Sequence, residues 1–159
     1  MTTGDHEFKD STFVPRSRDE VFAFFSDAAN LEEITPPQLR FRITTAVPVR
    51  MGVGTLIDYK LSLFGIPFGW RTRIVAWEPG VCFVDEQLKG PYAKWVHTHS
   101  FSDAPGGTLV NDSVVYRLPL FPVGEIALPL IRLQLKYIFS HRTKRIRELL
   151  ASESLPPRT

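Results

Sequence analysis

Two histidines in the middle of the chain have the spacing and the surroundings that chemistry requires. His97 and His99 lie two residues apart in a segment, 92–102, whose alternating pattern is typical of a β-strand. Residues two apart point to the same face of a strand, and Trp95 and Phe101 share that face. We therefore expect both imidazoles to point toward an apolar interior, where a histidine can act as an acid, a base or a hydrogen-bond partner.

Carboxylates in the neighbouring strands are the expected partners of these imidazoles. Asp112 lies among apolar residues of the following segment, and a turn at the intervening Pro-Gly-Gly sequence places it opposite His99 or His97, depending on the register. The preceding segment brings either Asp85 or Glu86 to the same face, again depending on the register. A carboxylate beside an imidazole orients the ring and raises its basicity, which general acid–base catalysis requires.

Several interpretations of this His–Asp group follow from the sequence. His97 or His99 could act as an acid–base catalyst that Asp112 orients. The group could instead recognise the polar end of a ligand, or satisfy its own hydrogen bonds and set the strand register. The same three residues also form a 2-His-1-carboxylate set, but no cysteine or further histidine supports a metal site, so we predict no metal and no cofactor.

The elements that position these residues begin with a strand and two short helices. The stretch 6–15 has the pattern of a strand, and Ser17 with Glu20 three residues later forms a capping box that starts a helix. A second short helix is expected over 30–34, and Pro36 ends it.

The rest of the chain predicts six strands followed by one long helix. Alternation of apolar and polar residues, bounded by Gly and Pro turns, predicts strands over 39–44, 55–64, 68–77, 81–88, 92–102 and 108–118. Asp58 and Arg73 are expected to pair across the wet face of one hairpin. From about Gly124 to Ser152 apolar residues recur at helical spacing. We therefore predict an α+β fold in which a curved antiparallel sheet of about seven strands wraps on a long C-terminal helix, with two short helices after the first strand.

This order of elements resembles the helix-grip fold of the SRPBCC superfamily, which includes the START and birch-pollen-allergen domains. Two stretches carry the resemblance: Ser11-Thr12-Phe13 through Asn30-Leu31-Glu32, and Phe83-Val84-Asp85-Glu86-Gln87 through Trp95, His97, His99, Phe101 and Asp112. The second stretch is similar to a bacterial subfamily of ligand-binding, polyketide cyclase/dehydrase-like proteins. The resemblance implies a ligand cavity between sheet and helix, and a possible epimerase- or dehydratase-like protein partner.

We expect the chain to bind a hydrophobic small molecule, such as a lipid, a polyketide or another polycyclic compound. One alternative is a cofactor-independent cyclase or dehydratase that uses His97 or His99 with Asp112, and another is an interaction domain for the epimerase-like partner. The residues expected to line the cavity are Tyr59, Leu61, Trp70, Phe83, Asp85, Trp95, His97, His99, Phe101, Tyr116, Ile131, Leu135 and Ile138.

Composition and charge limit the classes of partner and the cellular location that we expect for this chain. The chain has 159 residues, a formal net charge of +2 and a single cysteine, Cys82. The charge is too small for a nucleic-acid footprint, and the first ten residues hold no apolar signal-peptide core. No apolar run reaches the length of a membrane span. We expect one cytoplasmic domain over 1–159, with a flexible tail at 152–159 and no nucleic-acid partner.

Two further stretches, an apolar loop and a basic run, are candidates for contacts at the surface. The apolar loop from Leu118 to Pro122 could gate the cavity, touch a membrane, or pack as a plain connection into the helix. The basic run 141–147 is expected to form a solvated helix face, with contact to anionic lipid or to a nucleotide-bearing partner as the alternative.

Overall fold

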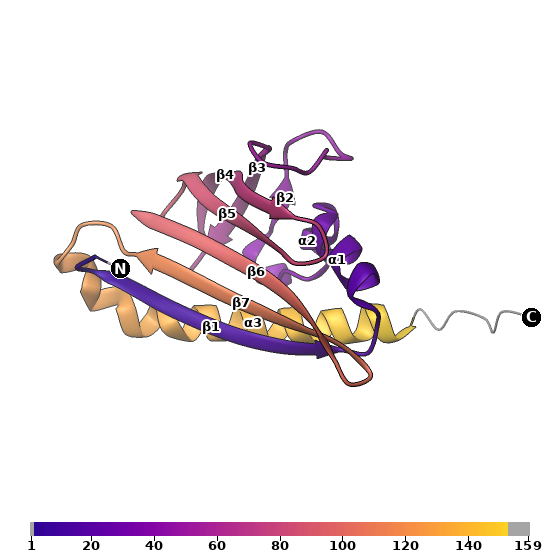
Figure 1. Cartoon of the computed structure of the whole chain (residues 1–159). Coiled ribbons are helices and arrows are strands. Elements are labelled where there is room, and N and C mark those ends of the chain that lie inside the picture. The colour runs from indigo at the N-terminus through magenta and orange to yellow at the C-terminus, as the bar shows by residue number, and fades with distance from the viewer. Residues whose placement is uncertain (1, 153–159) are drawn as a thin grey trace, which may run out of the picture.

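The computed structural model describes residues 2–152 of the chain (Figure 1). The elements, in chain order, are β1 (Asp5–Val14), α1 (Arg18–Ser26), α2 (Asn30–Glu33), η1 (Pro37–Leu39), β2 (Arg42–Ile43), β3 (Leu56–Leu63), β4 (Ile66–Glu78), β5 (Cys82–Lys89), β6 (Lys94–Ala104), β7 (Gly107–Arg117), η2 (Val123–Ala127) and α3 (Leu128–Ser152). This order confirms the predicted α+β helix-grip fold. The predicted tail lies outside the described residues, except for its first residue, Ser152.

The seven strands form one antiparallel sheet in the order β1-β7-β6-β5-β4-β3-β2. Strands β2 to β7 follow one another as a meander, and the last strand, β7, pairs with the first, β1. The pairing of β4 with β5 shifts register twice, and such bulges bend and twist a sheet. Figure 1 shows the curved sheet with α3 running along one face and α1 and α2 at one end.

The first helix begins as its sequence predicts. The Ser17 hydroxyl accepts a hydrogen bond from the Glu20 backbone N–H at 3.3 Å, so Ser17 is the N-cap of α1. Val21 and Phe22 are buried on the inner side of this helix, against the sheet.

The hairpin of β3 and β4 corrects one predicted pair. Leu63 pairs with Ile66, so the turn is Phe64-Gly65, and both residues have positive φ, as a two-residue hairpin turn requires. This register places Asp58 opposite Arg71, which donates to it at 2.8 Å. The predicted Asp58–Arg73 pair was wrong, because the expected turn was longer than the one that forms.

Two further boundaries differ from the prediction. The strand expected over 39–44 is reduced to β2, since Leu39 belongs to the 3-10 turn η1. The long helix begins at Leu128, after the separate 3-10 turn η2, so Pro129 lies in its first turn, where its missing N–H breaks no helical hydrogen bond. No helix among residues 2–152 is both long and apolar enough to cross a membrane.

The core between sheet and helix divides into two apolar clusters. One contains Trp70, Tyr92, Val114, Tyr116, Leu135 and Phe139, and the other contains Val14, Phe22, Phe83, Phe101, Val110 and Ile146. Along β7, Asp112 lies between Val110 and Val114, and along α3, Arg142 lies between Phe139 and Ile146. A polar belt therefore crosses the interior where the two apolar clusters meet.

Candidate functional site

Three adjacent strands supply the polar belt. In β6 the alternation buries His97, His99 and Phe101, and in β7 it buries Asp112. Asp112 pairs in register with His99, while His97 pairs with Asp85 of β5. Since side chains at paired positions share a face, all four polar groups point toward α3.

The hydrogen bonds run diagonally across this register. His97 Nε2 lies 2.7 Å from Asp112 Oδ1, and His99 Nε2 lies 2.9 Å from Asp85 Oδ2. Because an ionised carboxylate only accepts, both Nε2 atoms are the donors. His99 Nδ1 is also 3.1 Å from Asp112 Oδ1, although the N–H is not aligned for a hydrogen bond. Asp112 thus hydrogen-bonds His97 and also lies close to His99. The sequence left open which of the two histidines faces Asp112, and in the structure both do.

The same register decides which acidic residue of β5 faces inward. Asp85 points into the interior, where the Thr72 hydroxyl lies 3.4 Å from its Oδ1. Glu86 points outward and pairs with Arg73. Asp85 is therefore the second carboxylate of the belt.

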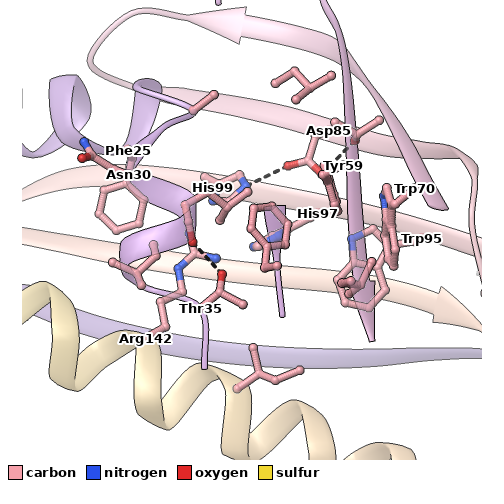
Figure 2. A pocket seen from close by; sticks show the side chains of 18 of the residues that line it. Phe25, Asn30, Thr35, Tyr59, Trp70, Asp85, Trp95, His97, His99 and Arg142 are labelled. Atoms are coloured by element: carbon pink, nitrogen blue, oxygen red, sulfur yellow. Dashed lines mark hydrogen bonds and ion pairs between the residues drawn. The ribbon is translucent and has the colours of Figure 1, made fainter. Parts of the chain in front are cut away.

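Arg142 is the cation of the belt, and it corrects the interpretation of the basic run. We expected residues 141–147 to be a solvated face, but only 9% of Arg142 is exposed. Its guanidinium carbon lies 5.3 Å from the ring centre of Phe25 and 5.6 Å from that of Phe139. Figure 2 shows Arg142 reaching up from α3 toward the region of Phe25 and His99.

The electrostatics keep both carboxylates ionised. Burial by itself raises the pKa of Asp112, but the charge of Arg142, the hydrogen bond of His97 and the closeness of His99 outweigh it and hold that pKa well below its usual range. Burial likewise raises the pKa of Asp85, but the His99 hydrogen bond and the nearby positive charges lower it overall. Each carboxylate therefore remains a charged acceptor inside the protein.

The two imidazoles are driven in opposite directions. Burial lowers the pKa of His97, and the neighbouring His99 lowers it further, against the pull of Asp112. Burial also lowers the pKa of His99, but the carboxylates of Asp112 and Asp85 outweigh it and raise that pKa. A proton donor and a proton acceptor thus lie side by side, which is the pairing that acid–base chemistry needs.

A cavity of about 180 Å³ opens between the sheet and α3 along this belt (Figure 2). Ten of the thirteen predicted lining residues border it: Tyr59, Leu61, Trp70, Phe83, Asp85, Trp95, His97, His99, Leu135 and Ile138. Tyr59 stacks on Trp70, and Trp70 meets Trp95 edge to face, so one wall of the cavity is aromatic.

Three predicted lining residues lie elsewhere. Phe101 is packed against Phe22 and Phe25 in the core next to α1, and Tyr116 is 1% exposed in the other core cluster. Ile131 borders a separate hollow nearer the start of α3. Phe101 and Tyr116 point to the correct face of the sheet, but other side chains cover them, and a face pattern does not reveal that. Asp112 lies behind the histidines and does not border the cavity.

Several lining residues escaped the sequence analysis, chiefly Gln134, Phe139 and Arg142 of α3. A signal for two of them was present. Phe139 and Arg142 follow Leu135 at spacings of four and seven residues, so they share its helix face. The charge of Arg142 concealed this position, because a basic residue near a helix end usually points to solvent.

The side chains of the belt include a possible set of metal ligands, but it differs from the set that the sequence suggested. Ligand atoms of Asp85, His97 and His99 lie within 4.8 Å of one another, whereas the sequence suggested Asp112 as the carboxylate. Both Nε2 atoms already donate to carboxylates, so a metal bound through them would have to displace these hydrogen bonds.

Comparison with known proteins agrees with the fold and defines the class. Residues 14–135 match the family model described as polyketide cyclase / dehydrase and lipid transport, and the chain belongs to this family. No protein among the curated ones matches the chain.

Solved structures share the fold at low sequence identity. The protein TTHA0849 of Thermus thermophilus is similar with a TM-score of 0.74 and 18% identity, over 94% of this chain and 100% of that one. The Zhui aromatase/cyclase of Streptomyces sp. R1128 gives a TM-score of 0.75 at 12% identity, over 92% and 94%. Ginseng major latex-like protein 151 of Panax ginseng gives 0.64 at 15%, over 96% and 99%.

Proposed function

We propose that this protein binds a hydrophobic small molecule in the cavity between its sheet and α3. The observation that carries the proposal is the cavity itself, which has an aromatic wall at Tyr59, Trp70 and Trp95 and the polar belt on another side. Apolar cavities with a few placed polar groups are the usual form of small-molecule sites.

The size of the cavity limits the ligand. An apolar cavity of roughly 150 Å³ accommodates benzene, whereas drug-sized ligands occupy roughly 300 Å³ or more. The space of about 180 Å³ therefore suits a compact aromatic body of one or two rings, unless side chains move to admit more.

The first experiment is native mass spectrometry of gently purified protein, followed by extraction and identification of any bound molecule. A second measures quenching of tryptophan fluorescence by added naphthalene, because Trp70 and Trp95 border the cavity. Ile138→Trp should fill the cavity and abolish the response. Leu133→Trp, on the outer side of the same helix and 66% exposed, is the matched control.

The outcome separates binding from its absence. A co-purified apolar molecule, or naphthalene binding that Ile138→Trp removes and Leu133→Trp leaves intact, supports the proposal. Empty protein that does not respond to naphthalene, or responds equally in both variants, contradicts it.

A second candidate function is cofactor-independent cyclisation or dehydration. His97 and His99 border the cavity with pKa values shifted in opposite directions, so one ring can accept a proton while the other donates one. One structural neighbour is named an aromatase/cyclase. Incubation with a linear aromatic triketone should then yield an aromatic product by ultraviolet absorbance, and His97→Gln should slow its formation. Unchanged product formation in His97→Gln and His99→Gln would exclude this role.

Contact with a membrane is favoured by the surface around η2. Leu118 of the predicted loop is buried, but Leu120 and Ile126 are 81% and 83% exposed. A second hollow of about 240 Å³ lies beside this loop and shares Leu63 and Tyr92 with the main cavity. An apolar ligand that leaves a lipid surface could pass through the second hollow and reach the cavity between Leu63 and Tyr92.

A further inference from the structure

The Arg142 guanidinium has no hydrogen-bond acceptor among the residues that the structure describes. Its Nε is buried and unpartnered, and among residues 2–152 no hydrogen bond or ion pair to its other nitrogens is found. A guanidinium carries five N–H donors and stays charged at any physiological pH. Burying such a group without acceptors costs free energy, so its position calls for a partner.

Neither the two carboxylates of the belt nor the nearby Asp10 supplies that partner. Asp112, Asp85 and Asp10 feel the charge of Arg142, but each forms its hydrogen bonds with other groups. Asp112 and Asp85 are engaged by His97 and His99, and Asp10 is 3.4 Å from the Thr143 hydroxyl. The donors of Arg142 therefore remain free for a group that comes from outside the chain.

The Arg142 side chain borders the cavity. The guanidinium lies against the rings of Phe25 and Phe139, and all three residues border the same space. Two more buried polar atoms, Trp70 Nε1 and Gln134 Oε1, belong to residues that line the cavity, and neither has a hydrogen-bond partner within the described part of the chain.

We propose that the ligand of this cavity is an organic acid whose carboxylate binds the Arg142 guanidinium and whose aromatic body lies against Phe25, Phe139 and the aromatic wall. The proposal rests on the proposed function and deepens it, because it names the ligand class. A carboxylate matches the two-pronged donor geometry of a guanidinium.

The test compares two probes of nearly the same shape. 2-Naphthoic acid carries a carboxylate, and 2-naphthamide presents a neutral amide in its place. Affinities are measured by tryptophan fluorescence or calorimetry for the unmodified chain, for Arg142→Gln and for Arg142→Lys. Arg147→Gln, which removes an exposed cation from the same helix, is the matched control.

The expected result is that the unmodified chain and Arg147→Gln bind the acid about tenfold or more tightly than the amide. Arg142→Gln should lose this preference while it still binds the amide, which also shows that the variant is folded. Arg142→Lys should keep part of the preference, because it retains the charge without the fork of donors.

Two other results would overturn the proposal in different ways. Equal affinity of the unmodified chain for acid and amide, or a preference that survives in Arg142→Gln, refutes the role of Arg142 and leaves the binding function standing. Failure of the unmodified chain to bind either probe refutes the binding function at this ligand size, and the ligand class with it.

Discussion

His97 and His99 stack ring on ring, with centroids 3.7 Å apart, and both face the same oxygen of Asp112. Two imidazoles this close cannot both carry a charge without cost, since like charges repel strongly in a buried site. Asp85 resolves the competition, because it contacts His99 and not His97 at hydrogen-bond distance. The pair is thus built to hold one proton more firmly on His99.

The first prediction concerns the titration of these two rings. In NMR spectra the pKa of His99 should lie above 6.5 and that of His97 below it, with the causes given above. The pair shares its protons, so each curve should show the influence of the other. His97→Gln and His99→Gln assign the signals.

Asp112→Asn provides the control for this titration. The amide carries no charge, so the pKa of His99 should fall towards or below 6.5 in this variant. Identical titration curves in the two proteins would mean that Asp112 does not govern the histidines.

The second prediction concerns stability. Asp112→Ala should lower the free energy of unfolding in urea by about 3–5 kcal/mol, because it removes the buried carboxylate that hydrogen-bonds His97 and offsets the charge of the buried Arg142. Asp58→Ala removes a carboxylate from an exposed cross-strand pair with Arg71, and its effect should be far smaller. If the two variants lose similar amounts of unfolding free energy, the buried Asp112 contributes no more to stability than an exposed ion pair does.

The third prediction concerns acid. The folded pKa values of Asp85 and Asp112 lie below the ordinary value of 3.8. The stability that they contribute is therefore present in full above that value, and it is lost as the pH falls from there through the lower folded pKa values. Urea unfolding followed from about pH 6 down to about pH 3 should show a steep fall in stability, and the fall should be shallower in Asp112→Asn. Parallel curves would contradict the charge of Asp112 in the folded protein.

The fourth prediction concerns the exposed apolar surface near η2. Vesicles of phosphatidylglycerol and phosphatidylcholine should carry the protein in a flotation assay, since Arg132 and Lys136 are exposed on α3 next to this surface. Replacing Leu120 and Ile126 together by Ser should remove most of this association.

Val53→Ser is the matched control for the vesicle experiment. Val53 is 70% exposed in the segment before β3, away from η2 in the sequence, so its loss should leave flotation unchanged. Absence of flotation in the unmodified protein would show that the surface around η2 serves another purpose.

The sequence by itself determined the order of elements, the sheet and the inward histidines. The two-residue period of a strand and the spacing of a helix face depend only on which residues are apolar and become buried. Both patterns can therefore be recognised in the sequence. His97, His99 and Asp112 were brought to one face by that same alternation. The turn at Phe64-Gly65 shows the limit, because a shift in turn length moved the partner of Asp58 from Arg73 to Arg71.

Only the tertiary structure decided which inward residues border empty space and which are covered. Tyr116 and Trp95 have equivalent positions in their strand patterns, yet one is buried in the core and the other lines the cavity. The burial of Arg142 was decided in the same way, since it depends on α3 lying across Asp112 and Phe25, which are distant in the sequence. Local pattern reports the preference of each side chain for water, whereas a cavity is the space that distant segments leave between them.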